Sequence, residues 1–270
     1  MVEHPSPAPL TPALRGSPGH GMYRVLRAAW RLLRCAVHVL QGLVTCALVF
    51  PLLAQLARRR RIEAWSRGLL DALGIRLEVH GTLADGPVLL ACNHVSWLDI
   101  VALQAVHAAR FVSKAEVARW PLVGMLVRRC GTILVDRARR RDAHRAVQAI
   151  ADTLGSGERV AVFPEGTTGT GRQVMPFHAN VLEAAITADA VVQPVAIRHA
   201  DAHVPFSDAA AFVGSATLVG SLWRLARADR EVVHLTFCPP LEPRPADRRA
   251  LAVASRACIQ TRLDAAAICR

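Results

Sequence analysis

The chain has 270 residues, enough for one large domain with or without a small additional segment. Hydrophobic residues make up 52% of it, and the formal net charge at pH 7 is +12. A chain that is both apolar and basic favours an anionic membrane surface as partner. Nucleic acid is disfavoured, because we find no zinc-finger spacing and no aromatic-rich strand for single-strand binding. The seven scattered cysteines include no CxxC pair, which excludes a disulfide framework or a cysteine zinc site.

Residues 1–21 are rich in proline and lack apolar periodicity, so we expect a disordered tail. An amphipathic helix is predicted over 24–45, because polar residues recur there every three or four positions. The polar positions are Arg24, Arg27, Arg31, Arg34, His38, Gln41 and Thr45.

The next segment bears on how the chain meets a membrane. Residues 46–54 are almost wholly apolar, and four arginines follow at 58–61. A transmembrane helix over about 35–57 would be long enough for a hydrocarbon core of about 30 Å. A helix lying in the interface, with its arginines toward lipid phosphates, is favoured, because a spanning helix would have to shelter the polar stripe. A soluble amphipathic helix on a core is the third alternative. We assign 22–74 to a membrane-associating helical segment.

Beyond residue 75 strand-like and helix-like segments alternate, which predicts an α/β domain over 75–270 with a mixed sheet flanked by helices. The expected strands are 76–79, 88–91, 111–112, 132–135, 160–163, 191–197 and 231–237. The expected helices lie near 97–108, 121–129, 141–154, 179–188 and 247–266.

A histidine and an aspartate stand five residues apart in the stretch NHVSWLD, just after an apolar strand. Five residues place two side chains about 140° apart on an ideal helix. His94 and Asp99 can therefore meet only if His94 lies outside the helix and Asp99 in its first turn, with Ser96 as N-cap. Asp99 would then orient the imidazole to take a proton from an alcohol. The alternative is a capping box, in which Asp99 bonds only the backbone.

A second block, AVFPEGTTGTGR, follows another apolar strand at 161–172. A surface loop would explain its glycines, but not a carboxylate, Glu165, at the tip of a strand. Together these blocks resemble those of the glycerolipid acyltransferases of the lysophosphatidic acid acyltransferase family, over about residues 75–200. NHVSWLD is similar to the family's first block, FPEGTTGTG to its third and VVQPVAI to its fourth. The second block is matched by Lys114, Pro121, Gly124, Gly131 and Arg137.

The resemblance implies transfer of a fatty acyl group from a thioester donor to the free hydroxyl of 1-acylglycerol 3-phosphate, giving phosphatidic acid. His94 would be the general base and Asp99 its orienting partner. No metal or cofactor is expected, and acyl-CoA or acyl carrier protein would be the donor. Backbone N–H groups near the helix start after Asn93 are candidate donors to the oxyanion.

The resemblance also implies that the FPEGT block lines the acceptor site. Glu165 would bond acceptor hydroxyls or hold a basic neighbour, and Gly166 would let the backbone come close. Thr167 and Thr168 would offer hydroxyl and N–H donors.

Two basic residues are candidates for binding the substrate. Arg137 suits the acceptor phosphate, because a guanidinium pairs with phosphate through two hydrogen bonds. A surface salt bridge with Asp136 or Glu165 is the alternative. Lys114 is the second candidate, and a solvated lysine is its alternative.

Two positions depart from the family pattern and bear on substrate preference more than on chemistry. His178 stands where a basic residue is common, and Gln193 where an apolar residue or proline is common. An acyltransferase for another lysolipid, such as lyso-ornithine lipid, is an alternative function. A catalytically dead membrane lipid-binding protein is an alternative of a different class. The expected partners are membrane lipids, a lysolipid acceptor and the acyl donor, at the cytoplasmic face of the inner membrane.

Overall fold

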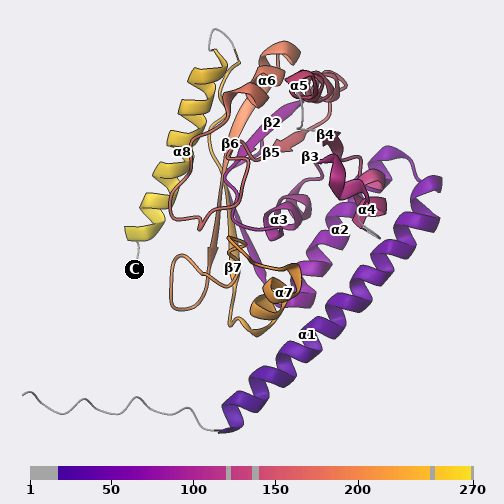
Figure 1. Cartoon of the computed structure of the whole chain (residues 1–270), viewed down its shortest axis with the longest axis vertical. Helices are drawn as coiled ribbons and strands as arrows, with labels where there is room; N and C mark the ends of the chain where they lie inside the picture. The colour runs from indigo at the N-terminus through magenta and orange to yellow at the C-terminus, as the bar shows by residue number, and fades with distance from the viewer. Residues whose placement is uncertain (1–17, 120–122, 136–139, 244–246, 269–270) are drawn as a thin grey trace, which may run out of the picture.

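The computed structural model describes residues 18–119, 123–135, 140–243 and 247–268, and within them seven strands form one sheet in the order β1-β7-β6-β2-β5-β3-β4 (Figure 1). The strands are β1 (Arg76–His80), β2 (Val88–Cys92), β3 (Arg110–Lys114), β4 (Ile133–Val135), β5 (Val160–Val162), β6 (Val191–Ala200) and β7 (Val232–Phe237). The β6–β7 pair is antiparallel and the other pairs are parallel. Each strand falls on an expected one, which confirms the mixed α/β class.

Helices cover both faces of this sheet. They are α1 (Pro18–Val44), α2 (Gln55–Leu73), α3 (Leu98–Val106), α4 (Val123–Arg129), α5 (Arg140–Gly155), α6 (Glu183–Ala188), α7 (Leu218–Arg227) and α8 (Arg248–Ile268). Shorter helical turns are η1 (Thr45–Val49), η2 (Phe50–Leu52), η3 (Ala115–Arg119) and η4 (Ala179–Leu182). Helix α1 begins inside the predicted tail, at a proline that suits the first helical turn. Helix α7 was not predicted, although Thr217 caps it by accepting from the Gly220 amide.

Strand β2 lies in the middle of the sheet and is buried on both faces. Its residues Leu90 and Cys92 pack into a core with α2, α3 and α7, whereas Leu89 and Ala91 pack into a core with α5, α6 and α8. Burial on alternating sides is typical of a parallel strand with helices on both faces. The segment NHVSWLD starts at the next residue and is therefore held at a rigid point of the fold.

Helices α1 and α2 form an antiparallel pair joined by η1 and η2 (Figure 1). The rings of Trp65 and His38 cover Gly42 and Gly68 respectively, and a Cβ at either glycine would overlap the ring. The indole nitrogen of Trp65 donates to the His38 carbonyl at 3.1 Å, and His38 Nε2 lies 2.8 Å from the Trp65 carbonyl. The last turns of α2 join the core with α3, so the hairpin is packed onto the sheet domain.

The middle of the polar stripe on α1 faces the protein, and the expectation that it faces lipid phosphates is wrong there. Arg31 donates to the carbonyls of Ala226 and Ala228 at 3.1 and 2.8 Å. Arg27 pairs with the Asp229 carboxylate at 2.8 Å. These acceptors lie at the C-terminal end of α7, where free carbonyls and the helix dipole attract cations. Periodicity defined the polar face correctly, but the unpredicted α7 decides which way that face points.

The other face of α1 is apolar and exposed, and it continues through η1 and η2. Trp30 and Leu40 are 60% and 61% exposed. Leu26, Leu33, Val37, Val44, Leu48 and Leu52 are also exposed on this segment. The helical segment Gly21–Leu52 is long and apolar enough to cross a membrane, by length and composition alone. This segment suggests membrane association, with the protein itself sheltering part of the polar stripe.

The topology brings the sequence blocks to one edge of the sheet. Strands β2, β5, β3 and β4 are neighbours and run parallel. The carboxyl ends of parallel strands meet at one edge, which is where ligands bind in open α/β sheets. The residues that follow β2 and β5 in the chain, NHVSWLD and FPEGT, therefore lie side by side.

Candidate active site

The His94 imidazole and the Asp99 carboxylate form the pair that the sequence predicts. His94 lies in the loop after β2, Asp99 lies in the first turn of α3, and His94 Nδ1 is 2.8 Å from Asp99 Oδ2. The His94 ring stacks on Phe163, with the ring centroids 3.8 Å apart. Asp99 is fully buried, whereas the His94 side chain is 18% exposed. The carboxylate therefore holds one ring nitrogen, and packing on Phe163 fixes the plane of the ring.

The capping alternative is also present, and it does not compete with the His94 contact. Asp99 Oδ2 accepts from the backbone amides of Val95 and Ser96 at 2.7 and 2.9 Å. The Ser96 hydroxyl lies 3.4 Å from the Leu98 amide, and it makes no close cap of the kind expected. The amides of Val95 and Ser96, together with that of His94, thus already donate to carboxylates. The prediction that these three amides bind the oxyanion is therefore wrong.

His199 is a member of this site that sequence reasoning missed. Its Nε2 lies 2.7 Å from Asp99 Oδ1, and the side chain is buried within β6. Burial alone would raise the pKa of Asp99, but the hydrogen bonds and charges of His199 and His94 together lower it below its usual range. Asp99 is therefore a carboxylate at neutral pH. Because it can only accept, His94 Nδ1 carries a proton and His94 Nε2 is left as the basic nitrogen.

Behind His199 lies a further buried acid, Glu231, next to β7. Ser207 donates to its Oε2 at 2.8 Å. Within the described residues, Glu231 Oε1 and His199 Nδ1 are buried without a hydrogen-bond partner. Burial raises the pKa of Glu231 to about 7, although the Ser207 hydrogen bond and the charge of His199 oppose the shift.

Glu165 occupies the tip of β5 as expected, but its partners are backbone groups. Its Oε1 accepts from the His94 amide at 2.7 Å and its Oε2 from the Met175 amide at 2.9 Å. It is 6% exposed and does not line the neighbouring cavity. Both Glu165 oxygens are thus held by backbone amides, and the contacts with acceptor hydroxyls or a basic neighbour stay predictions. Glu165 joins the two loops, and burial raises its pKa although these hydrogen bonds lower it.

The other residues of the FPEGT block line the cavity. Gly166 has φ +74°, a left-handed conformation that favours glycine, and its Cα faces the His178 ring. Thr167, Thr168 and His178 line the cavity with it. The Thr168 hydroxyl donates to the Phe212 carbonyl, and acceptor binding by Gly166 and Thr167 stays a prediction.

A cavity of about 1270 Å³ opens beside His94, between the helical hairpin and the edge of the sheet. Its wall is mostly apolar and includes Phe50, Trp65, Leu126 and Ile150. It exceeds the roughly 300–1,000 Å³ of ordinary small-molecule pockets. No sequence signal indicated that the α1–α2 hairpin would form one wall of this cavity.

The remaining predicted positions are placed less completely. Arg137 lies outside the described residues, and it follows β4 in the chain. The backbone of Lys114 ends β3 and pairs with Val135, while its side chain lies outside the described part. Gln193 is fully buried, and its amide bonds the loop at Thr82 and Ala84, away from the cavity lining. The difference from the family pattern at Gln193 therefore concerns packing of this loop. The difference at His178 concerns a side chain that lines the cavity.

Comparison with known proteins agrees with this geometry. A family model described as Acyltransferase matches residues 76–198. The lyso-ornithine lipid O-acyltransferase of Pseudomonas aeruginosa is 37% identical over 195 residues, covering 72% of this chain and 75% of that protein. The 1-acyl-sn-glycerol-3-phosphate acyltransferase of Neisseria meningitidis serogroup B is 36% identical over 189 residues, covering 67% of this chain and 71% of that protein.

A solved structure shares the fold. The 1-acyl-sn-glycerophosphate (LPA) acyltransferase PlsC from Thermotoga maritima superposes with a TM-score of 0.68 at 18% identity, over 91% of this chain and 96% of that one. With two relatives above 30% identity over more than two thirds of their length, the sequence resemblance is confirmed. The chain belongs to the lysophosphatidic acid acyltransferase family of glycerolipid acyltransferases, and it is an acyltransferase.

Proposed function

We propose that this enzyme transfers a fatty acyl group from a thioester to the free hydroxyl of 1-acylglycerol 3-phosphate, giving phosphatidic acid. The observation that carries the proposal is His94, held by the buried Asp99, in the wall of a large apolar cavity. An alcohol that enters the cavity meets an imidazole whose other nitrogen is already held by a carboxylate. This is the arrangement that a general base requires.

The proposed reaction needs one proton transfer in each direction. His94 Nε2 takes the hydroxyl proton as the alcohol oxygen attacks the thioester carbonyl, and a tetrahedral intermediate forms. The carbon–sulfur bond then breaks, and the imidazolium returns the proton to the departing thiol. Asp99 stays ionised and stabilises the transient charge on His94. No residue is acylated, and no metal or cofactor takes part in the proposed steps.

The hydrocarbon chains account for the size and character of the proposed substrate site. Both the lysolipid and the donor carry a fatty acyl chain, and the apolar wall of the cavity would exclude water from them. His178 and Thr167 line the same cavity near His94 and are proposed to bond polar groups of the acceptor. Arg137 and Lys114 remain candidates for its phosphate on sequence grounds, since guanidinium and ammonium groups bind phosphate.

We place the enzyme at the cytoplasmic face of the inner membrane, with the exposed apolar face of α1, η1 and η2 toward lipid. Burial of apolar surface, and only secondarily charge, would hold it there. Leu40→Glu should move the protein out of the membrane fraction, while raised salt should release little of it. Release by salt alone would show that the exposed arginines hold it instead.

Acyl carrier protein or coenzyme A is the proposed acyl donor. Both are acidic, which suits the net charge of +12 on this chain.

A second acceptor is a lysolipid without the glycerol phosphate, of the lyso-ornithine type. The Pseudomonas relative and a Brucella abortus relative, the latter 35% identical over 210 residues, carry the name lyso-ornithine lipid O-acyltransferase. Such an acceptor would need the same general base but no phosphate clamp.

An acceptor panel with purified protein separates these functions. Thiol release from the donor is measured with 1-acylglycerol 3-phosphate, with lyso-ornithine lipid and without acceptor. The proposal expects the phosphate-bearing acceptor to give the highest kcat/KM, and Arg137→Ala to reduce it roughly tenfold to a hundredfold. Turnover with lyso-ornithine lipid alone would assign the second function. Acceptor-independent thiol release with neither lipid consumed would contradict acyl transfer to both.

A further inference from the structure

A cluster of potential metal ligands lies on the two strands β1 and β7, outside the active site. Glu78 and His80 belong to β1, and His234 belongs to the neighbouring strand β7. In the sheet register His234 is level with Arg198 of β6, whereas the next residue of β6, His199, points to the other face and meets Asp99. Nothing in the proposed acyl transfer uses these three side chains.

The backbone register fixes the cluster in place. Glu78 and His234 are direct partners in the parallel β1–β7 pair, and His80 follows two residues further on the same face. Leu77, which precedes Glu78, and the neighbours of His234, Val233 and Leu235, pack into the core with α2 and α3. The three polar side chains therefore share the opposite face of the sheet.

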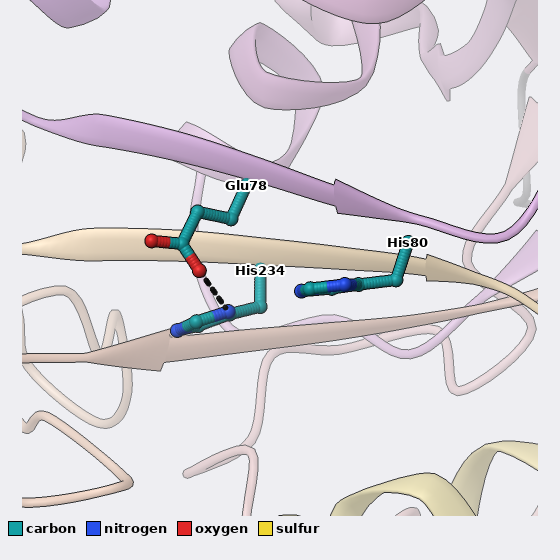
Figure 2. A group of neighbouring side chains, drawn as sticks. All are labelled: Glu78, His80 and His234. Carbon is teal, nitrogen blue, oxygen red and sulfur yellow. Dashed lines mark ion pairs between the residues drawn. The ribbon is translucent and has the colours of Figure 1, made fainter.

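The ligand atoms converge. Figure 2 shows the Glu78 carboxylate and the His80 ring both directed toward His234. His234 Nδ1 lies 3.3 Å from Glu78 Oε2, and one ligand atom from each residue lies within 4.8 Å of the others. The two imidazole planes are within 13° of each other, with centroids 5.9 Å apart. Bonds of about 2.0–2.2 Å to a tetrahedral ion bring ligand atoms to roughly 3–4 Å from one another. The exposed His80 can close that gap by rotation.

The local charges suit a cation in part. The Glu78 carboxylate supplies a negative charge among the three ligands. Arg198 stands opposite His234 in the β6–β7 register, and its guanidinium is held by the Pro205 carbonyl at 2.7 Å. That positive charge weakens the attraction for a cation, so a soft, strongly coordinating ion is required rather than Mg²⁺ or Ca²⁺.

We propose that Glu78, His80 and His234 bind one divalent transition-metal ion, with Zn²⁺ the best match to two imidazoles and one carboxylate. The ion would join β1 to β7. Strand β1 is the edge strand and directly follows α2, so the bound ion would hold the edge of the sheet, and the hairpin attached to it, in place. Its effect would be on stability, because the three ligands lie on the face of the sheet opposite to His199 and Asp99.

The test uses the full chain in detergent, stripped with a chelator and then titrated with Zn²⁺. One ion should bind per chain, and a hundredfold excess over Kd should raise the melting temperature by roughly 5–10 °C. His80→Ala and Glu78→Gln should each weaken binding at least tenfold, and His234→Ala should abolish it. His144→Ala removes an exposed histidine on α5, at the other end of the sheet, and should bind Zn²⁺ as the wild type does. Because His80 is exposed, its variant also remains informative if His234→Ala fails to fold.

Co²⁺ distinguishes this site from the thiols. The six described cysteines are free, and a thiolate ligand would give Co²⁺ a sulfur-to-metal charge-transfer band. The proposed site predicts a Co²⁺ spectrum without that band, which His80→Ala removes. Absence of ion binding by the wild type would overturn the proposal. Equal binding by wild type and His80→Ala, or a thiolate band, would overturn it as well.

Discussion

Two buried carboxylates follow neighbouring parallel strands at the same edge of the sheet, and their partners give them different tasks. Asp99, after β2, holds the rings of His94 and His199 in addition to two backbone amides, and its pKa is lowered. Glu165, after β5, holds the amides of His94 and Met175, and its pKa is raised. An acid that holds imidazoles can control a proton even when it also accepts from amides, whereas one held only by backbone amides fixes loops. Position at a strand end does not by itself separate catalysis from architecture.

The largest effect should come from the base held by Asp99. His94→Ala should lower kcat/KM for acyl transfer by about 10²–10⁴, because a positioned general base is lost. Membrane binding and circular dichroism should stay unchanged, since the side chain packs mainly on Phe163. Turnover is measured on folded protein only. Activity near the wild-type level would contradict the assignment of Asp99 to catalysis, because the imidazole that it orients would then take no part in the reaction.

The next effect concerns the second imidazole on Asp99. His199→Ala should reduce kcat/KM roughly tenfold to a hundredfold, because a hydrogen bond to a charged group is worth about 1.5–3 kcal/mol. Losing this partner also raises the pKa of Asp99, so the acid limb of the pH–rate profile should move to higher pH. His199→Gln, which can still donate, should recover part of the rate. A loss of stability with an unmoved pH profile would assign His199 to packing alone.

Glu165→Gln should act on stability. The amide NH₂ would face a backbone donor, and an unsatisfied buried donor costs about 1–3 kcal/mol of unfolding free energy. Denaturant titration measures the change, with Glu183→Gln on the surface as a matched control. An unchanged midpoint would mean that the two loops do not depend on this carboxylate.

The smallest effect should be on the pH dependence of stability, through the third buried acid, Glu231. Its pKa is about 7 in the folded chain and about 4.3 when unfolded, so its protonated form favours the native state. That contribution is complete below about pH 4.3 and is lost as pH rises through about 7. Melting temperatures from pH 5 to pH 8 should therefore fall less for Glu231→Gln than for wild type. Parallel curves would contradict a raised pKa.

The parts of the site that are local in sequence were predictable. His94 and Asp99 lie five residues apart, so helix geometry showed how they could meet, and the family resemblance favoured the pair over a capping box. His199 lies 100 residues from Asp99 and sits inside an apolar strand, where no pattern marks it as different from a core residue. The contacts of Glu165 reach 71 residues back and 10 forward to backbone amides, which carry no sequence signature. Strands such as β2 and β5 were predictable because each is a short apolar run between turns.

The orientation of α1 shows a further limit of sequence patterns. The periodicity identified a polar and an apolar face of α1. It did not determine which face packs against the protein, because either face can contact protein or lipid. Arg31 faces the protein because the carbonyls of Ala226 and Ala228 at the end of α7 accept from it. Helix α7 is short and contains glycine and serine, so its sequence pattern was too weak to predict it. The direction in which the polar stripe of α1 points depends on this helix.

The most direct test of the account compares Asp99→Asn with Glu165→Gln in one acyl-transfer assay, with rates corrected for the folded fraction. The two changes are isosteric, replace one buried carboxylate each, and affect adjacent loops. We expect Asp99→Asn to lose at least a hundredfold in kcat, because the amide orients the imidazole poorly and cannot stabilise its charge. Glu165→Gln should stay within about tenfold of wild type while melting earlier. Equal rate losses in the two variants would contradict the division between a carboxylate that controls a proton and one that fixes loops.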